Sequence, residues 1–226
     1  EQYRFRYPRL NNQQILRAGS TFPARFLGFD TEIREVRIRR RNQNAVFTRV
    51  LAFTEDKDKA FYYDRQINVT LPDDTPTGVY DLEIDIVGGR RTSTCRSPSS
   101  VIVVKDFPAD PCFVTFGHLD TSGQYQAEYM QRIATMANII GADMVLISNS
   151  VNAAYISGAL KHLQIPYVVN FGNHQMLGHQ RWYGPNLGSV SFGPNIAVLN
   201  YGAPWHNGIE KVVAELEKHQ EKTIKI

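Results

Sequence analysis

The 226-residue sequence has few cysteines and no long apolar run. No stretch approaches 18 consecutive apolar residues, so we expect no helix that crosses a membrane. No glycine loop of the phosphate-binding type is present, and no Ser-His-Asp or Cys-His order indicates a nucleophilic enzyme. Hydrophobic residues make up 42% of the chain and charged residues 21%, which excludes a disordered or fibrous protein.

The two cysteines, Cys95 and Cys112, leave two alternatives open. An even count permits one disulfide, and the first residue is Glu rather than Met, as expected where a secretory signal has been removed. The other alternative is a pair of reduced thiols. Their spacing does not match a zinc site.

Histidine is absent from the first half of the chain, because all six histidines follow residue 117. The net charge of +3 is too small to require a nucleic-acid partner. Lys105–Pro111 contains two prolines and is typical of a linker. We therefore predict two domains, 1–106 and 107–226, with any imidazole chemistry in the second.

The first domain is predicted to be an antiparallel β-sandwich. Short runs rich in Val, Ile, Phe and Tyr are separated by turn signals, and no helical period competes with them. Regular spacing of such strands is typical of a sandwich, and the stretch Pro72–Leu82 resembles the end of an immunoglobulin-like module. The runs are Thr21–Phe29, Ile33–Arg41, Ala45–Phe53, Ala60–Leu71, Val79–Val87 and Ser100–Lys105.

An arginine cluster lies in the strand Ile33–Arg41. Val36 and Ile38 are predicted on one face, with Arg37 and Arg39 on the other. The cluster could bind phosphate or nucleic acid, but no aromatic residues are interleaved with it as base stacking requires. We favour the solvated face of a strand, charged to discourage edge pairing.

The second domain alternates strands and helices, which predicts a largely parallel sheet of the α/β class. One helix, Gln124–Ile140, places Tyr125, Tyr129, Ile133, Met136, Ala137 and Ile140 on one stripe. The other predicted helices are Ala153–Leu163 and Gly208–Lys222. The predicted strands are Cys112–Phe116, Met144–Ser148, Tyr167–Phe171, Ser189–Phe192 and Ile196–Asn200.

Polar residues follow three of these strands. Right-handed crossovers place the carboxyl ends of parallel strands at one edge, where ligands bind in open α/β sheets. His118 and Asp120 follow the first strand, Ser150 follows the second, and Asn173 and His174 follow the third. The sequence therefore predicts that these groups converge on one crevice.

Several segments resemble the calcineurin-like metallophosphoesterase family. The segment Ile165–His174 resembles the family's P-x-x-x-x-x-G-N-H motif, and Ala142–Ser150 resembles its A-D-x-V-x-x-x-G-D strand and loop. Phe116–Leu119 lies where the family has D-x-H-L, and Ser189–Gly193 is similar to its Y-S-F-x-x-G hairpin. The resemblance implies a metallophosphoesterase-like α/β domain over 107–226, represented by its N-terminal portion.

The resemblance implies a degenerate metal site. Family members hold two divalent metals through carboxylates, whereas this chain has Phe116, Ser150 and Gln175 at three positions where the family has acidic residues. What remains by resemblance is His118 and Asn173 as metal ligands and His174 beside the phosphate or leaving oxygen. Two dications repel strongly without an anionic bridge.

Asp120 could supply a substitute carboxylate for a single metal. Alternatively, it is a loop residue that caps the following helix or is solvated. His118 and His174 have an alternative reading too, as hydrogen-bonded loop histidines. We therefore expect no firmly bound cofactor, with Mn, Fe or Zn used only where activity survives.

The resemblance implies a hydrolase of phosphoester small molecules that is inactive or impaired, that is, a pseudoenzyme. The alternative is a non-catalytic, extracytoplasmic binding or scaffolding protein that uses its β-sandwich to contact a glycan or protein. Whether the chain is an enzyme stays open, and so does whether its end is natural. Localisation is expected to be secreted or periplasmic, because the pairing of a sandwich with an esterase-like domain resembles secreted relatives.

Overall fold

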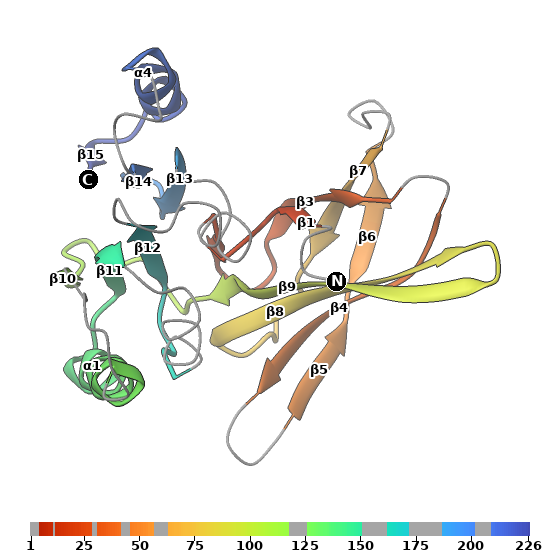
Figure 1. The fold of residues 1–226 in the computed structure, drawn as a ribbon, viewed down its shortest axis with the longest axis horizontal. Helices are drawn as coiled ribbons and strands as arrows, with labels where there is room; N and C mark the ends of the chain where they lie inside the picture. Colours follow the sequence, from red (N-terminus) through yellow and green to blue (C-terminus); the bar gives the residue numbers. More distant parts are fainter. Residues whose placement is uncertain are drawn as a thin grey trace. The chain divides into compact units, whose positions relative to one another are not determined.

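The computed structural model describes residues 5–10, 12–28, 31–41, 46–56, 63–117, 126–150, 162–171, 187–201 and 209–226. The chain divides into two compact units, Glu1–Asp106 and Phe107–Ile226. Most described elements are strands, so the predicted β-rich character is confirmed (Figure 1).

The first unit contains two sheets. The smaller is antiparallel, in the order β1-β3-β7-β6. Its strands are β1 (Phe5–Tyr7), β3 (Thr21–Leu27), β6 (Ala52–Glu55) and β7 (Asp64–Thr70). In the larger sheet, of order β2-β9-β8-β4-β5, only the β2–β9 pair is parallel. Its strands are β2 (Gln14–Leu16), β4 (Glu32–Arg41), β5 (Val46–Val50), β8 (Gly78–Gly88) and β9 (Arg91–Val103).

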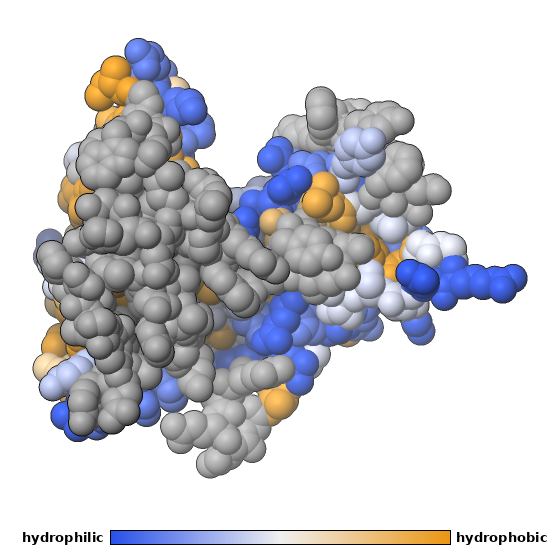
Figure 2. Space-filling view, viewed as in Figure 1, coloured by the Kyte–Doolittle hydropathy of each residue, from blue (hydrophilic) through white to orange (hydrophobic). Residues whose placement is uncertain are grey.

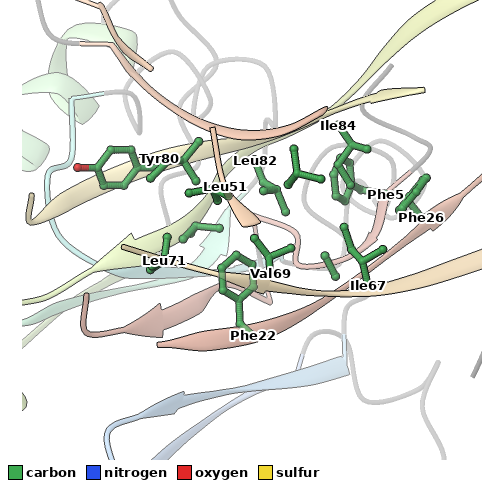
Figure 3. Close-up of a cluster of buried hydrophobic side chains, with 14 of the residues drawn as sticks. Phe5, Phe22, Phe26, Leu51, Ile67, Val69, Leu71, Tyr80, Leu82 and Ile84 are labelled. Atoms are coloured by element: carbon green, nitrogen blue, oxygen red, sulfur yellow. The ribbon is translucent and has the colours of Figure 1, made fainter. Parts of the chain in front are cut away.

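Both sheets of the first unit contribute side chains to one hydrophobic core (Figure 3). Phe22 and Val69 come from the smaller sheet, and Leu82 and Ile84 from the larger one; all four are almost fully buried. β3 shows the origin of this burial, because its buried and exposed residues alternate with the period of a strand. Each such side chain stabilises the fold by roughly 1.5–3 kcal/mol.

The predicted single strand Ala45–Phe53 is two strands in different sheets. β5 pairs with β4 in the larger sheet, whereas β6 pairs with β7 in the smaller one. Leu51 lies between them, buried in the common core, and its N–H donates to the carbonyl oxygen of Val36 at 2.8 Å. Because Leu51 points into the core, the chain crosses from one sheet to the other at this residue.

Strand β9 is longer than the prediction Ser100–Lys105, because it begins at Arg91. The turn signal Ser97-Pro98 lies inside the strand, where the β8–β9 register shifts between Tyr80 and Leu82. Ser99 has a φ of 48°, which is uncommon for a residue other than glycine. A β-bulge therefore accommodates residues that are typical of a turn.

The second unit contains two three-stranded sheets and two described helices. One sheet is parallel, in the order β10-β11-β12, and the other, in the order β13-β14-β15, contains an antiparallel hairpin that turns at Gly193. The strands are β10 (Phe113–Gly117), β11 (Met144–Ser150), β12 (Tyr167–Phe171), β13 (Leu187–Phe192), β14 (Ile196–Tyr201) and β15 (Ile224–Lys225). The helices are α1 (Gln126–Ile140) and α4 (Ile209–Glu217). The predicted helix Ala153–Leu163 lies outside the described residues, apart from its last two positions.

Both described helices leave apolar side chains in solvent. On α1, Ala134 and Ala137 are buried, whereas Met136 and Ile140 of the predicted stripe are 59% exposed. On α4 no residue is buried, and Ile209 is 68% exposed. The space-filling view shows hydrophobic surface over α4 at the upper left (Figure 2). Neither described helix is long and apolar enough to cross a bilayer.

Neither cysteine forms a disulfide: Cys95 is buried in the first unit and Cys112 is exposed in the second. Of the two alternatives left open by the sequence, the structure therefore has the reduced form.

Candidate functional site

Four strands of the second unit end side by side. β10 and β11 are parallel, with Gly117 opposite Ser148 near their carboxyl ends. Asn170 of β12 donates from Nδ2 to the carbonyl oxygen of Tyr201 at 2.7 Å, which places the end of β14 beside the end of β12. We name this row the carboxyl edge and define it by Gly117, Ser148, Asn170 and Asn200. Ligands commonly bind at the carboxyl ends of strands in open α/β sheets.

Gly117 and Ser148 are closely packed at one end of this edge. The space that a side chain at position 117 would need is occupied by the Ser148 hydroxyl, because a Cβ there would overlap Oγ. The same Cβ would lie 3.4 Å from the Ser148 carbonyl oxygen. Because residue 117 is glycine, there is room for the exposed hydroxyl of Ser148 at this end of the carboxyl edge.

Asn200 carries an unpaired carboxamide in the interior. The residue is 2% exposed, and neither its Nδ2 nor its Oδ1 has a hydrogen-bond partner within the described part of the chain. Leaving a buried polar group unpaired costs about 1–3 kcal/mol. Such a group in a folded protein requires an explanation, and a bound molecule that supplies the missing partners is one.

Unfilled space lies beside Asn200. In the β13–β14 hairpin Asn200 is opposite Gly188, which is also buried. A Cβ built on Gly188 would meet no atom of the described residues within 4 Å. The donor and acceptor of Asn200 therefore lie beside a position that no side chain of the described residues fills.

A second polar cluster lies on the opposite face of the same hairpin, against α4. Ser189 Oγ donates to Glu215 Oε1 at 2.5 Å, and His219 Nε2 lies 2.6 Å from the same Oγ. Because the single hydroxyl proton goes to Glu215, the imidazole must donate to Oγ and cannot act as a base toward it. A catalytic triad needs the reverse order, so this cluster attaches α4 to β13 instead.

The charge of Glu215 is stabilised within this cluster. Burial by itself would raise the pKa of Glu215, but hydrogen bonds from Lys218 and Ser189 and the charges of Lys218 and His219 outweigh burial and lower it. The carboxylate therefore stays ionised to a lower pH than an ordinary glutamate does. Charge-assisted hydrogen bonds hold α4 to the hairpin.

Arg37, within the arginine cluster of β4, is paired with carboxylates of the first unit. Arg37 donates to Glu83 at 2.9 Å, to Glu35 at 2.9 Å and to Asp85 at 2.5 Å. These bonds, led by the one to Asp85, raise the pKa of Arg37 further above its ordinary value. Val36 and Ile38 lie on the buried face, as predicted. A guanidinium that is already surrounded by carboxylates does not favour binding of a phosphate.

Most residues predicted to form the metal site lie outside the described residues. These are His118, Asp120, Asn173, His174 and Gln175. Phe116 is described and half-buried in β10, and Ser150 pairs through its backbone with Phe171 at the end of β11. Among the described residues, no three His, Cys, Asp or Glu side chains come together as metal ligands. The expectation about cofactors therefore stays a prediction.

Reasoning from the sequence missed Asn200, Asn170 and Gly188. The prediction considered the residues that follow each strand and overlooked the last residues inside the strands. A signal was present, since Asn200 ends the otherwise apolar run Ile196–Leu199. A carboxamide that continues a buried strand is unusual and indicates a polar requirement there.

Comparisons with known proteins identify no family. No family model and no curated protein matches the chain. A similar solved structure is amylomaltase from Corynebacterium glutamicum, with 15% identity and a TM-score of 0.30 over 66% of this chain and 23% of that one. Another is β-D-glucuronidase from Dictyoglomus thermophilum, with 12% identity and a TM-score of 0.33 over 72% of this chain and 31% of that one.

A third similar structure is a family 123 glycoside hydrolase from Clostridium perfringens. It has 10% identity and a TM-score of 0.26 over 62% of this chain and 33% of that one. The chain thus spans a third or less of the length of these three enzymes. TM-scores near 0.3 do not establish a shared fold.

The predicted membership of the metallophosphoesterase family is wrong. No family model matches, and the similar structures named above are glycan-processing enzymes rather than metallophosphoesterases. The predicted function as an impaired phosphoester hydrolase, or pseudoenzyme, fails with it. No observation favours the alternative of binding through the sandwich.

The physical reason for the error lies in the motifs. Apolar strands followed by Gly, Asn or Ser, as in Tyr167–Asn173 and Met144–Ser150, arise in any parallel α/β unit. The part of these motifs that would be specific is their set of carboxylates, which this sequence lacks at Phe116, Ser150 and Gln175.

Proposed function

We propose that the second unit binds a small, neutral molecule rich in hydroxyl groups, such as a sugar, at the carboxyl edge. The observation that carries the proposal is the buried carboxamide of Asn200, which lies opposite Gly188 and for which the described residues provide neither a hydrogen-bond partner nor a side chain that fills the space at 188. A carboxamide presents a donor and an acceptor side by side, so it can bond two neighbouring hydroxyls of one ligand.

The other described groups of the carboxyl edge suit the same ligand class. Ser148 contributes an exposed hydroxyl. Asn170 donates from its side-chain Nδ2 to Tyr201, and its side-chain oxygen Oδ1 can accept a hydrogen bond from a ligand. None of these groups is charged. Neutral donors and acceptors that converge at a sheet edge fix the orientation of a polar ligand without selecting for ionic charge.

Two features of the fold support the finer predictions about architecture. The two sheets that share one core in the first unit support an immunoglobulin-like β-sandwich over 1–106. The parallel order of β10, β11 and β12, with α1 between the first two, supports an α/β domain over 107–226.

The test is ligand titration of the whole chain by calorimetry, with neutral monosaccharides and disaccharides, glucuronate and inorganic phosphate as probes. We expect heat of binding from at least one neutral sugar, and none from phosphate. The variant Asn200→Val removes both polar atoms, so it should abolish binding while leaving stability unchanged or raised, because an unpaired buried group is lost.

A matched control is Leu199→Val, which changes the neighbouring residue on the other face of β14. This variant should bind as the parent does. Absence of binding by every neutral sugar, or equal binding by Asn200→Val, would overturn the proposal.

A further inference from the structure

Strand β5 is the outermost strand of the larger sheet in the first unit (Figure 1). Leu51 N–H donates to the Val36 carbonyl, so residues 47, 49 and 51 form the hydrogen-bonded pairs with β4. The backbone groups of the alternate residues, Val46, Thr48 and Val50, therefore point away from the sheet. They form a row of donors and acceptors along the edge, for which the described residues provide no partner strand.

The side chains of this edge do not protect it. Val46 and Val50 are each 58% exposed, and Thr48 between them is also exposed. Edge strands are usually protected by lysine, proline or a bulge. β5 contains neither residue, and its register with β4 is regular.

The other face of β5 is already engaged. Phe47 packs edge-on against Tyr80, with ring centroids 5.9 Å apart. Arg49 forms two hydrogen bonds to Asp74, at 2.5 and 2.9 Å, which compensate its charge. The edge therefore has a fixed conformation and no uncompensated charge along β5.

We propose that two copies of this chain associate by antiparallel pairing of their β5 strands about a two-fold axis at Thr48. In that register Thr48 lies opposite Thr48 of the second copy, and Val46 lies opposite Val50 of the second copy. All three are hydrogen-bonded positions, so about six N–H···O=C bonds join the copies. The two larger sheets become one continuous sheet.

The occupant is a second copy because the exposed residues of the edge are symmetric about Thr48. Valine stands two residues before it and two residues after it, so each exposed valine contacts a valine across the axis. No like charges lie opposite each other on this face. The arginines of β4 that lie opposite Val50 and Thr48, Arg37 and Arg39, interact with Glu83. Addition of a strand to a free sheet edge is a recurring mode of association.

The first test is the mass of the full chain by sedimentation velocity over a range of micromolar concentrations. We expect a dimer whose population rises with concentration. Thr48→Pro removes the outward N–H and leaves the bonds to β4 intact, so it should be monomeric. Thr48→Val retains the N–H and should remain dimeric. A monomeric parent chain, or a dimeric Thr48→Pro variant, would overturn the proposal.

A second test fixes the register and does not depend on how well Thr48→Pro folds. In a Cys112→Ser background, Thr48→Cys should form an intermolecular disulfide on mild oxidation, because the two Cα atoms lie about 5.5 Å apart across the axis. Val46→Cys is the matched control, since its two copies would be about 14 Å apart along the strands. Equal cross-linking of both variants, or of neither, would contradict the pairing.

Discussion

Arg37 donates from Nε to Glu83 Oε2 at 2.9 Å, and the two residues face each other across the β4–β8 ladder. The Glu83 side chain is only 4% exposed, whereas that of Arg37 is 18% exposed. A carboxylate this deeply placed on the outer face of a sheet depends on its partner, because an unpaired buried charge is strongly destabilising.

Replacing Arg37 by Met should therefore lower the free energy of unfolding by about 3 kcal/mol, because Glu83 loses its nearest cation. The double variant Arg37→Met/Glu83→Leu should recover most of that loss, since neither charge remains. Urea unfolding of the four proteins in the cycle measures both effects. If Arg37→Met were as stable as the parent, Arg39 and Arg96, at 3.8 and 3.7 Å from Glu83, would be sufficient to compensate the charge of Glu83.

The attachment of α4 should weaken in acid. The pKa of Glu215 is lowered from its ordinary 4.5, because the bonds from Lys218 and Ser189 outweigh burial. A carboxyl with a lowered folded pKa stabilises the fold when ionised, so its contribution is complete above pH 4.5 and disappears as the pH falls through the folded value. The protection factors of the α4 amides, which correct hydrogen exchange for the intrinsic effect of pH on its rate, should therefore fall on acidification below that pH.

Two variants check the origin of this acid effect. Glu215→Gln removes the titrating group and should give α4 protection factors that no longer change over the same pH range. Ser189→Ala should cost about 1 kcal/mol at neutral pH, because one hydrogen bond to the carboxylate is lost. An unchanged pH profile in Glu215→Gln would assign the effect to another group.

Gly193 should tolerate alanine less well than Gly141 does. Both have left-handed backbones, with φ of 66° and 72°, so alanine costs about 1–2 kcal/mol at each. At Gly193 a Cβ would also lie 2.8 Å from Cγ of Phe107, whereas at Gly141 it would meet nothing within 4 Å. We expect Gly193→Ala to lower the free energy of unfolding by about 3 kcal/mol, as measured by thermal unfolding. Equal losses at the two positions would mean that Phe107 moves aside freely.

The carboxyl edge should depend on the absence of a side chain at 117. Gly117→Ala should destabilise the second unit by about 1–2 kcal/mol, because the new methyl overlaps Ser148 Oγ. Ser148→Ala in the same chain removes the overlapping atom and should restore most of the loss. Denaturant unfolding of the parent, both single variants and the double variant gives the coupling free energy between the two positions. If the changes in unfolding free energy of the single variants simply add up in the double variant, the two side chains do not contact each other.

Sequence periodicity was sufficient for elements that bury one face. β4 was predicted to within one residue because Val36 and Ile38 alternate with arginines, and β12 was predicted at its observed bounds, Tyr167–Phe171, because it is a short apolar run between Pro166 and Gly172. In both cases the local pattern and the tertiary environment require the same structure.

Other features depend on contacts that are distant in the sequence. The crossing at Leu51 depends on a core formed by two sheets, and the path of β9 through Pro98 depends on a bulge against β8. The importance of Asn200 depends on its burial opposite Gly188, which only the β13–β14 register reveals. Periodicity alone contains none of this information.

In the first unit a single residue, Leu51, separates a strand of one sheet from a strand of the other. Because this connection is one residue long, neither sheet can separate from the other without pulling on β5 or β6, the strands that Leu51 joins. Under mechanical load, this unit should therefore rupture in one event instead of layer by layer.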